Sequence, residues 1–342
     1  MSPIAPALDR LTARIGTLSQ RLGQRVDVGS LKVTDRQGVL PLAEPGLWSP
    51  NRACRLVQTA DGWIAINLAR EEDRELVPAW LCTDMTGDPW DAIVELARAC
   101  QTKPLIDQAI LLGMPVARVS EVREMKLDPP ALPLGRSGPP EAERPLRVVD
   151  LSALWAGPLC GAVLAAMGAD VVKVESPRRP DPTRVTSPAF YQRLNGQKGE
   201  LELDLVSPAG RAKLQDEVAA ADVLITSARP RGLASLGLEA AQTFKANPRL
   251  TWVAITGYGW EGDAAMRVAF GDDAAAAGGL VRWTEAGEPH FLGDALSDPV
   301  TGLAAASGAL AAVIDGGGRL IDVAMARSAA AAAAVCGLAV AA

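Results

Sequence analysis

Residues 148–177 read VVDLSALWAGPLCGAVLAAMGADVVKVESP, and this stretch decides the fold. Apolar runs at 146–151 and 170–175 flank a segment of small residues at 160–167 that has the composition of a helix. An apolar strand, a helix and a second apolar strand in this order predict a β–α–β unit. Continuous rather than alternating apolar strands indicate a parallel sheet that is covered on both faces.

The same alternation continues on the C-terminal side of this unit. A helical segment at 208–220 and the dipeptide Asn247-Pro248 separate further strand-length apolar runs at 200–205, 223–225 and 249–256. The sequence therefore predicts an α/β fold, with a Rossmann-like parallel sheet and helices on both of its faces. Ligands of such sheets bind at the carboxyl ends of the strands.

The N-terminal part has a different pattern and predicts a smaller α+β unit. Residues 1–45 show weak helical periodicity and a short strand-like piece at 31–33. The turn Ala60-Asp61-Gly62 separates two alternating segments that are typical of a hairpin. The remaining pieces are strands at 54–59, 63–68 and 115–119 and helices at 72–81, 89–99 and 103–112.

Residues 127–145 hold six prolines and two glycines without periodicity, which is typical of a linker or a strap across the surface. We therefore predict a small domain with its leading segment at 1–126, a Pro-rich linker at 127–145, and a large Rossmann-like domain at 146–342.

Composition narrows the class of protein. The chain has 342 residues and a net charge of −6, which argues against a nucleic-acid partner. Only 4% of the residues are aromatic, and the many small residues favour close packing of helices on a sheet. The five cysteines are scattered without metal-type spacing, which favours a reducing, cytoplasmic setting and no metal site. Residues 1–25 lack a signal-peptide core, and the apolar run at 328–342 is too short to span a bilayer, so we expect no membrane association.

A second stretch carries a candidate catalytic residue. Residues 291–313 read FLGDALSDPVTGLAAASGALAAV, and Asp298-Pro299 ahead of an Ala-rich run predicts the start of a helix. Asp298 could cap the free amides of that helix. It could equally be a carboxylate whose pKa the helix dipole lowers, kept ionised to attack an activated acyl carbon. The two interpretations are compatible.

Residues 257–262, GYGWEG, fit the dinucleotide pattern GxGxxG. The pattern requires a helix directly after it and an acidic residue about twenty positions on, and neither follows here. We therefore interpret Gly257 and Gly259 as part of a glycine-rich turn near the active site.

From residue 148 onward the chain resembles the class III CoA-transferase family, which includes formyl-CoA transferase, carnitine CoA-transferase and α-methylacyl-CoA racemase. The resemblance is carried, in family order, by the 148–177 stretch, DPTR (181–184), NGQKGELELDLVSPAGR (195–211), ADVLITSARPRGLASLGL (221–238), NPRLTWVAITGYG (247–259), LSDPVTGLAAASGALAAV (296–313) and DGGGRLIDVAMARS (315–328).

The first part of the chain resembles the C-terminal portion of the same family. The similar segments are DGWIAINLA at 61–69 and LLGMPVARVSEVREMKLDP at 111–129. The resemblance therefore implies a circular permutation, with the Pro-rich linker joining the two family portions.

The resemblance implies a role for Asp298, which falls on the catalytic Asp of the family, four residues before Gly302. In the transferases that carboxylate attacks an acyl-CoA thioester and forms an anhydride and then an aspartyl-CoA thioester. Asp272 or Asp273 matches a further acidic residue, and the alignment does not choose between them. The family's glycine-rich covering loop corresponds to 46–51, GLWSPN, which is nearly free of glycine.

The resemblance also places coenzyme A. Leu154, Trp155 and Ala156 fall where the family lines the thioester, and Leu203 falls beside the adenine, or is simply a core residue. Ser227 and Ala228 match positions that are Asn-Phe in many members. Charge for the phosphates could come from residues that could equally be solvated surface charges: Lys173, Arg178, Arg179, Arg184, Arg229 and Arg231.

The implied activity is an acyl-CoA:carboxylate CoA-transferase, with a CoA thioester and a carboxylic acid as substrates and no tightly bound cofactor. Two alternatives stay open: a non-catalytic acyl-CoA binder, and a racemase, against which Phe244 stands at the position of the racemase His. Family members form dimers whose chains interlock, so we expect a homodimer in which the linker could cross between subunits.

Overall fold

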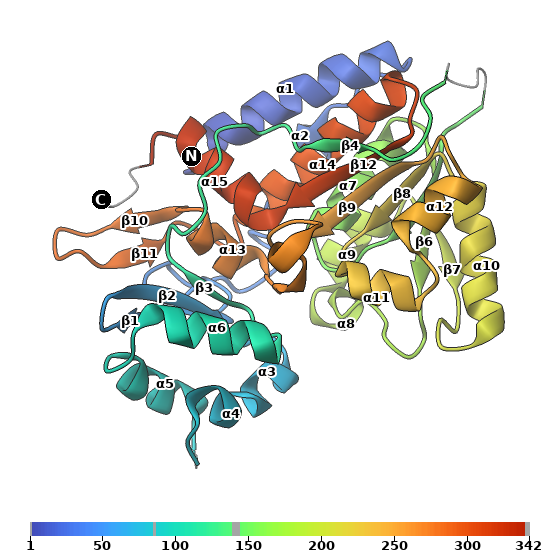
Figure 1. Cartoon of the computed structure of the whole chain (residues 1–342). Helices are drawn as coiled ribbons and strands as arrows, with labels where there is room; N and C mark the ends of the chain where they lie inside the picture. Colours follow the sequence, from blue (N-terminus) through green and yellow to red (C-terminus); the bar gives the residue numbers. More distant parts are fainter. Residues whose placement is uncertain (1, 85–86, 139–143, 339–342) are drawn as a thin grey trace.

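The structure is a computed structural model that describes residues 2–84, 87–138 and 144–338. Its centre is a sheet with strand order β4-β12-β9-β8-β5-β6-β7 (Figure 1). β4 pairs antiparallel with β12, and the other neighbours pair in parallel. The strands are β4 Ala131–Pro133, β5 Arg147–Leu151, β6 Asp170–Glu175, β7 Gly199–Glu202, β8 Val223–Thr226, β9 Thr251–Thr256 and β12 Arg319–Ala324. The predicted α/β fold is confirmed.

Helices cover both faces of this sheet, because successive residues of a strand point to opposite sides. Val148 and Ile225 face one core, whereas their neighbours Val149 and Leu224 face the other. The first core is completed by α1 Ala5–Arg21, α7 Ala156–Ala166, α9 Pro188–Asn195, α14 Ser297–Ile314 and α15 Met325–Val335. The second is completed by α10 Pro208–Ala219, α11 Pro230–Ser235 and α12 Ala240–Ala246.

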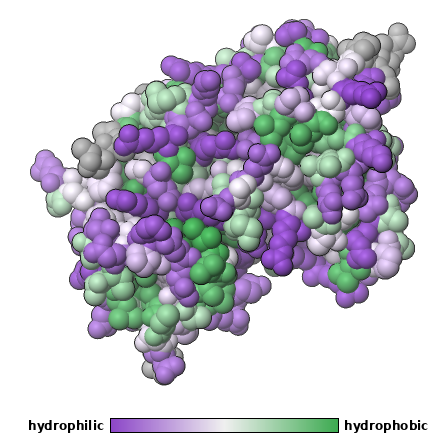
Figure 2. All heavy atoms as spheres, in the orientation of Figure 1, coloured by the Kyte–Doolittle hydropathy of each residue, from purple (hydrophilic) through white to green (hydrophobic). Residues whose placement is uncertain are grey.

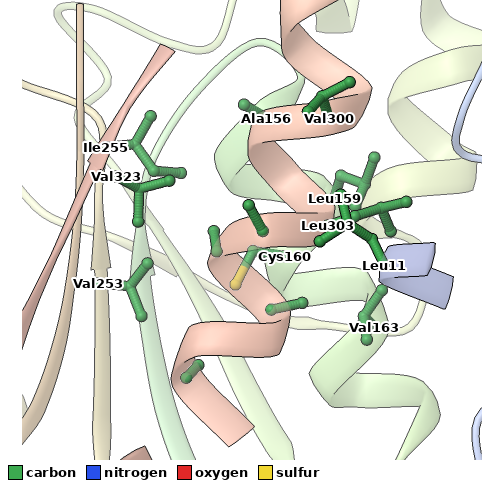
Figure 3. Close-up of a cluster of buried hydrophobic side chains, with 14 of the residues drawn as sticks. Leu11, Ala156, Leu159, Cys160, Val163, Val253, Ile255, Val300, Leu303 and Val323 are labelled. Carbon is green, nitrogen blue, oxygen red and sulfur yellow. The ribbon is translucent and has the colours of Figure 1, made fainter. Parts of the chain in front are cut away.

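The central helix of the first core is α14. It is rich in Ala and Gly, so it can approach α7 closely: a Cβ at Gly302 would lie 2.6 Å from the carbonyl oxygen of Ala156. Figure 3 shows Val300 and Leu303 of α14 in the same apolar cluster as Val253. The helix is long and apolar enough to span a membrane, but 72% of it is buried inside the protein, as in an ordinary core helix.

The smaller unit is built on an antiparallel sheet of β1 Cys54–Thr59, β2 Gly62–Asn67 and β3 Val116–Arg118. One face packs under α4 Val77–Leu81, α5 Pro89–Ala97 and α6 Thr102–Leu112, while α3 Glu71–Glu75 leads into them. The other face packs against α13 Gly271–Ala277 and the hairpin of β10 Val281–Trp283 and β11 Pro289–Phe291. The unit is therefore fixed to the large domain by an apolar interface.

Three predicted elements were wrong or incomplete. Residues 31–33 form no strand; the chain there makes the short helix α2, Val28–Leu31, which Asp27 caps through its side chain. The helix predicted at 72–81 is broken at Leu76 into α3 and α4. The strand predicted at 200–205 is the shorter β7, which runs from Gly199 to Glu202. Two small helical segments, α8 Thr183–Thr186 and η1 Gly262–Met266, lie in loops.

The described part of the Pro-rich linker forms regular backbone hydrogen bonds with the large domain. Its residues 131–133 form the edge strand β4, and beyond it the amide of Gly135 donates to Gly318 O at 2.9 Å. The amide of Arg136 likewise donates to Pro248 O at 2.7 Å. Residues 139–143 lie outside the described residues. The described part of the linker therefore pairs with the large domain of its own chain.

The face shown in Figure 2 is mostly hydrophilic, with apolar areas over the small unit and near the sheet edge and an indentation between the small unit and the sheet domain. Exposed large apolar side chains include Leu111 at the end of α6 and Leu134 just after β4.

Candidate active site

The site lies where the parallel strands end and α14 begins. Ser297, the first residue of α14, donates its Oγ hydrogen to Met325 O, directly after β12, at 2.9 Å. The loop that follows β5 runs into α7, whose first residue, Ala156, packs against α14. The first turn of α14 is thus held at the carboxyl edge of the sheet, which is where the sheet topology predicts a ligand site.

Asp298 is the second residue of α14 and not its cap. Leu296 occupies the N-cap position, and the helix has no side-chain cap. The amide of Asp298 donates to Ala295 O at 2.9 Å, so a tight turn starts the helix before the Asp-Pro pair. The carboxyl instead points away from its own helix: a Cβ at Gly271 would lie 2.0 Å from Asp298 Oδ2. The predicted capping role of Asp298 is therefore wrong.

Two further aspartates surround Asp298, and the sequence pointed to only one of them. Asp272 Oδ1 accepts from the amide of Ala295 at 2.7 Å, and its Oδ2 accepts from Asn51 Nδ2, also at 2.7 Å. Asn51 Nδ2 donates as well to Asp294 Oδ1 at 2.8 Å. Asp294 stands four residues before Asp298. This short spacing is the one local feature of the sequence that could have identified Asp294 as a site residue.

The guanidinium of Arg36 balances this acidic cluster, which we define as Asp272, Asp294 and Asp298. Arg36 Nε donates to Asp294 Oδ2 and Nη2 donates to Oδ1, each at 2.7 Å, in a two-point ion pair. Only 17% of the Arg36 side chain is exposed. Nothing in the local sequence around Arg36 predicted this position.

The electrostatics of Asp298 differ from what its helix position predicts. The pKa of Asp298 is raised to about 7. Burial is the largest cause, and the nearby carboxylates Asp272 and Asp294 act in the same direction, whereas Arg36 and the amide of Ala156 lower the pKa. The expectation that the helix dipole lowers this pKa is wrong, because desolvation and like charge outweigh the dipole. Burial, together with Asp294, also raises the pKa of Asp272 to about 6.

The structure separates the two candidate acids of α13. Asp272 belongs to the acidic cluster, whereas Asp273 turns toward the small unit and accepts from Asn67 Nδ2 at 3.2 Å and from the amide of Phe270 at 2.9 Å. Burial raises the pKa of Asp273 well above its ordinary value. Of the two, Asp272 is thus the one that lies beside Asp298.

The segment expected to be the covering loop, residues 46–51, does reach the site, through Asn51. Its Oδ1 accepts from the amide of Ala53 at 2.8 Å and from Ser49 Oγ at 2.9 Å, so both ends of the amide group are held. The segment therefore supplies a fixed polar contact where a glycine-rich loop would supply mobility.

Positions 154–156 lie beside the cluster. Trp155 is 3% exposed, donates its Nε1 hydrogen to Val33 O at 2.8 Å, and lies under Arg36, whose Cζ is 4.8 Å from the ring centre. Leu154 has a φ of 69° and donates its amide to Asp181 at 3.1 Å. Trp155 is therefore a buried support for Arg36 rather than an open wall for a thioester.

The charges assigned to the phosphates of coenzyme A are mostly engaged. Lys173 is buried and donates to Ser152 O at 2.8 Å and to Asp181 at 3.3 Å, so it cannot meet a phosphate at the surface. Arg184 binds Glu175 and Glu200. Arg229 is exposed and donates to Met266 O at 3.2 Å.

The remaining predicted contacts are spread along the same edge of the sheet. Ser227 and Ala228 are exposed directly after β8, and Ser227 Oγ accepts from the amide of Ala153 at 3.1 Å. Leu203 is partly buried and packs on the second core. Gly257 lies against Ala269, and Gly259, with a φ of 152°, lies against Arg327. Among the described residues no His, Cys, Asp or Glu group is arranged to hold a metal ion.

Comparison with known proteins extends these observations. Over 199 residues the chain is 34% identical to the succinate–glutarate CoA-transferase of Agrobacterium fabrum, covering 53% of this chain and 50% of that protein. The formyl-CoA:oxalate CoA-transferase of Streptomyces coelicolor is 31% identical over 193 residues, with 53% and 47% covered. The chain thus spans about half the length of the curated relatives it matches.

The fold comparison agrees. A crystal structure of a CAIB/BAIF family protein from Brucella suis superposes with a TM-score of 0.52 and 31% identity, covering 58% of this chain and 56% of that one. The circular permutation stays a prediction, because the match to the family does not reach the N-terminal unit. Residues 144–338, more than half of the chain, match the model of CoA-transferase family III, and the chain therefore belongs to that family.

Proposed function

We propose that the protein is an acyl-CoA:carboxylate CoA-transferase in which Asp298 is the nucleophile. The observation that carries the proposal is the position of Asp298. Asp298 is half-buried as a residue and lies at the carboxyl edge of the parallel sheet, and its carboxyl faces the backbone amide of Ala156 at the start of α7. Membership of the family supports the class of reaction.

The proposed chemistry needs one ionised carboxylate. An oxygen of Asp298 attacks the thioester carbonyl carbon, the C–S bond breaks, and CoA leaves as the thiolate, so that a mixed anhydride remains. The thiolate attacks the aspartyl carbonyl carbon, releases the first carboxylate and leaves an aspartyl-CoA thioester. The acceptor carboxylate repeats the first step, and the thiolate returns to the acceptor's acyl carbon. Asp298 is regenerated, and protons and electrons balance.

Neighbouring groups have distinct parts in this proposal. The amide of Ala156 would stabilise negative charge on the attacking carboxyl, as backbone donors do in acyl transfer. Asp272 would act as the supporting acid, since its pKa of about 6 lets it hold or release a proton near neutral pH. The CoA thioester is the substrate, and no tightly bound cofactor is needed for these steps.

Trapping of the covalent intermediate tests the proposal. The protein would be incubated with formyl-, succinyl- and glutaryl-CoA, trapped with hydroxylamine, and mapped by mass spectrometry. We expect an adduct on Asp298 that Asp298→Asn abolishes. Asp315→Asn is the matched control, because Asp315 ends the same helix and its side chain is 54% exposed. No adduct with any thioester, with exchange activity retained in Asp298→Asn, would refute the nucleophile.

The alternatives lead to different results. A non-catalytic binder would bind CoA in calorimetry without exchanging label between acyl-CoA and acid. A racemase would need two acid–base groups that flank the α-carbon. Phe244 is instead buried in the second core and stacks with Trp252, with ring centres 6.3 Å apart, so this position offers no acid–base group.

We also propose that the enzyme works as a cytoplasmic homodimer. The support is the exposed apolar surface at Leu111 and Leu134 and the scattered free cysteines. The small unit already completes the site of its own chain through Asn51, so the dimer need not exchange it. Light scattering at micromolar concentration would detect the dimer, and a monomer would contradict it.

A further inference from the structure

Arg36 lies where the leading segment passes over the site. Its guanidinium forms the two-point ion pair with Asp294 and stacks over the ring of Trp155. Trp155 in turn donates to Val33 O, three residues before Arg36. This contact ties the segment that carries the cation to the start of α7. The hydrogen bond from Trp155 to Val33 therefore helps to hold both the guanidinium of Arg36 and the amide of Ala156 beside Asp298.

The charges that face Asp298 come from several elements. Asp272 is on α13, Asp294 is in the turn before α14, and Arg36 is on the leading segment. If the acidic cluster were fully ionised, three negative charges would share one positive charge. Asn51 donates to two of these carboxylates but carries no charge. Loss of the guanidinium would leave Asp298 against two uncompensated carboxylates in a poorly hydrated place.

We propose that Arg36 is a positioning residue for the transfer reaction: held by Asp294 and Trp155, its fixed positive charge keeps Asp298 ionised and therefore nucleophilic near neutral pH. This inference rests on the proposed role of Asp298. It adds a residue outside the family-matched segment, 144–338, to the reacting centre. Asp294 has a double effect, because it orients Arg36 and also repels the charge of Asp298.

A titration without substrate tests the proposal independently of activity. Protein labelled with ¹³C at the aspartate carboxyl carbons would be titrated by NMR, and the Asp298 resonance assigned by its loss in Asp298→Asn. In Arg36→Met we expect the midpoint to rise by at least about one pH unit, because about 1.4 kcal/mol of charge stabilisation corresponds to one unit. In Arg36→Lys the midpoint should lie above that of the parent but well below that of Arg36→Met, because Lys keeps the positive charge without the two-point geometry.

Two further variants sharpen the result. Asp294→Asn should lower the midpoint, because the amide oxygen can still accept from Arg36 while the negative charge is gone. Arg21→Met, an exposed arginine in the last turn of α1, is the matched control and should not move it. If Arg36→Met folds poorly, Arg36→Lys and Asp294→Asn carry the test, and only shifts in opposite directions support the proposal. An unchanged midpoint in Arg36→Met, or shifts of the same sign in Arg36→Lys and Asp294→Asn, would overturn it.

The pH profile of the reaction separates this inference from the proposed function. If Asp298 forms the adduct, the rate of adduct formation in Arg36→Met should fall about tenfold in mildly acidic buffer and recover in alkaline buffer, following the midpoint. A purely structural role would lower the rate at every pH. If no adduct forms on Asp298 but the midpoint shifts as expected, the proposed function fails and the charge relation of Arg36 and Asp298 stands.

Discussion

Replacing Lys198 by Met should destabilise the protein strongly, because Lys198 is the buried partner of Asp150 below the site. Neither side chain is exposed, and Lys198 Nζ donates to Asp150 Oδ2 at 2.7 Å, to Pro158 O at 2.9 Å and to Asn195 Oδ1 at 2.8 Å. Met fills a similar volume, so the loss would be electrostatic rather than a cavity. Asp150 would keep its contact with the amide of Ser152 at 3.0 Å.

The magnitude follows from what remains around Asp150. Removing one partner of a buried ion pair typically costs about 3–5 kcal/mol, because the other charge stays buried without compensation. Lys173 also lowers the pKa of Asp150, after the larger effects of burial, which raises it, and of Lys198. Its charge compensates in part, so we expect the lower end of that range, about 3 kcal/mol. The pKa of Asp150 is lowered overall, so its ionised carboxylate stabilises the folded protein at every pH above the ordinary pKa of an Asp side chain. This stabilisation is lost as the pH falls through the lowered pKa of Asp150.

Urea unfolding followed by tryptophan fluorescence would measure this effect, since Trp155 and Trp252 are buried next to the sheet. Arg178→Met is the control, because Arg178 pairs with Asp204 in solvent with 64% of its side chain exposed, and its loss should cost less than about 1 kcal/mol. Adding Asp150→Asn to Lys198→Met should recover part of the loss, as expected for coupled residues. A loss below about 1 kcal/mol in Lys198→Met would refute the reasoning.

The remaining predictions concern the helix contact and the titration of Asp298. Gly302→Ala would place a methyl 2.6 Å from Ala156 O, so α14 must shift away from α7. We expect the free energy of unfolding measured in urea to fall by about 1–3 kcal/mol, and adduct formation on Asp298 to weaken. If both quantities stayed unchanged, the close approach of the two helices would be contradicted. Asp298→Asn should be more stable than the parent protein above about pH 7 and equally stable near pH 4. The pKa of Asp298 is raised to about 7, so the parent protein loses stability as the pH rises through that value and the buried carboxyl ionises. Equal stability of the two proteins at both pH values would speak against the raised pKa.

The sheet could be predicted because its strands are buried on both faces, and a buried parallel strand is an apolar run. β9 is buried at every position and reads TWVAIT, and β6 was predicted with its observed bounds. Helix starts were less predictable where small residues dominate. α7 begins at Ala156 rather than near residue 160, because the Ala-Gly-Pro start has little apolar pattern and its position is fixed by close contact with α14.

The acidic cluster shows where local reasoning ends. From the sequence, Asp298 has one evident influence, the dipole of its own helix, and that influence lowers a pKa. In the fold Asp272 comes from 26 positions earlier and Arg36 from 262 positions earlier, and burial removes the water that would screen them. Burial and the charge of Asp272 raise the pKa of Asp298, whereas Arg36 lowers it, as the dipole does, and the raising effects prevail. A charge at a helix start can therefore be located from sequence, but its ionisation depends on partners that only the fold brings together.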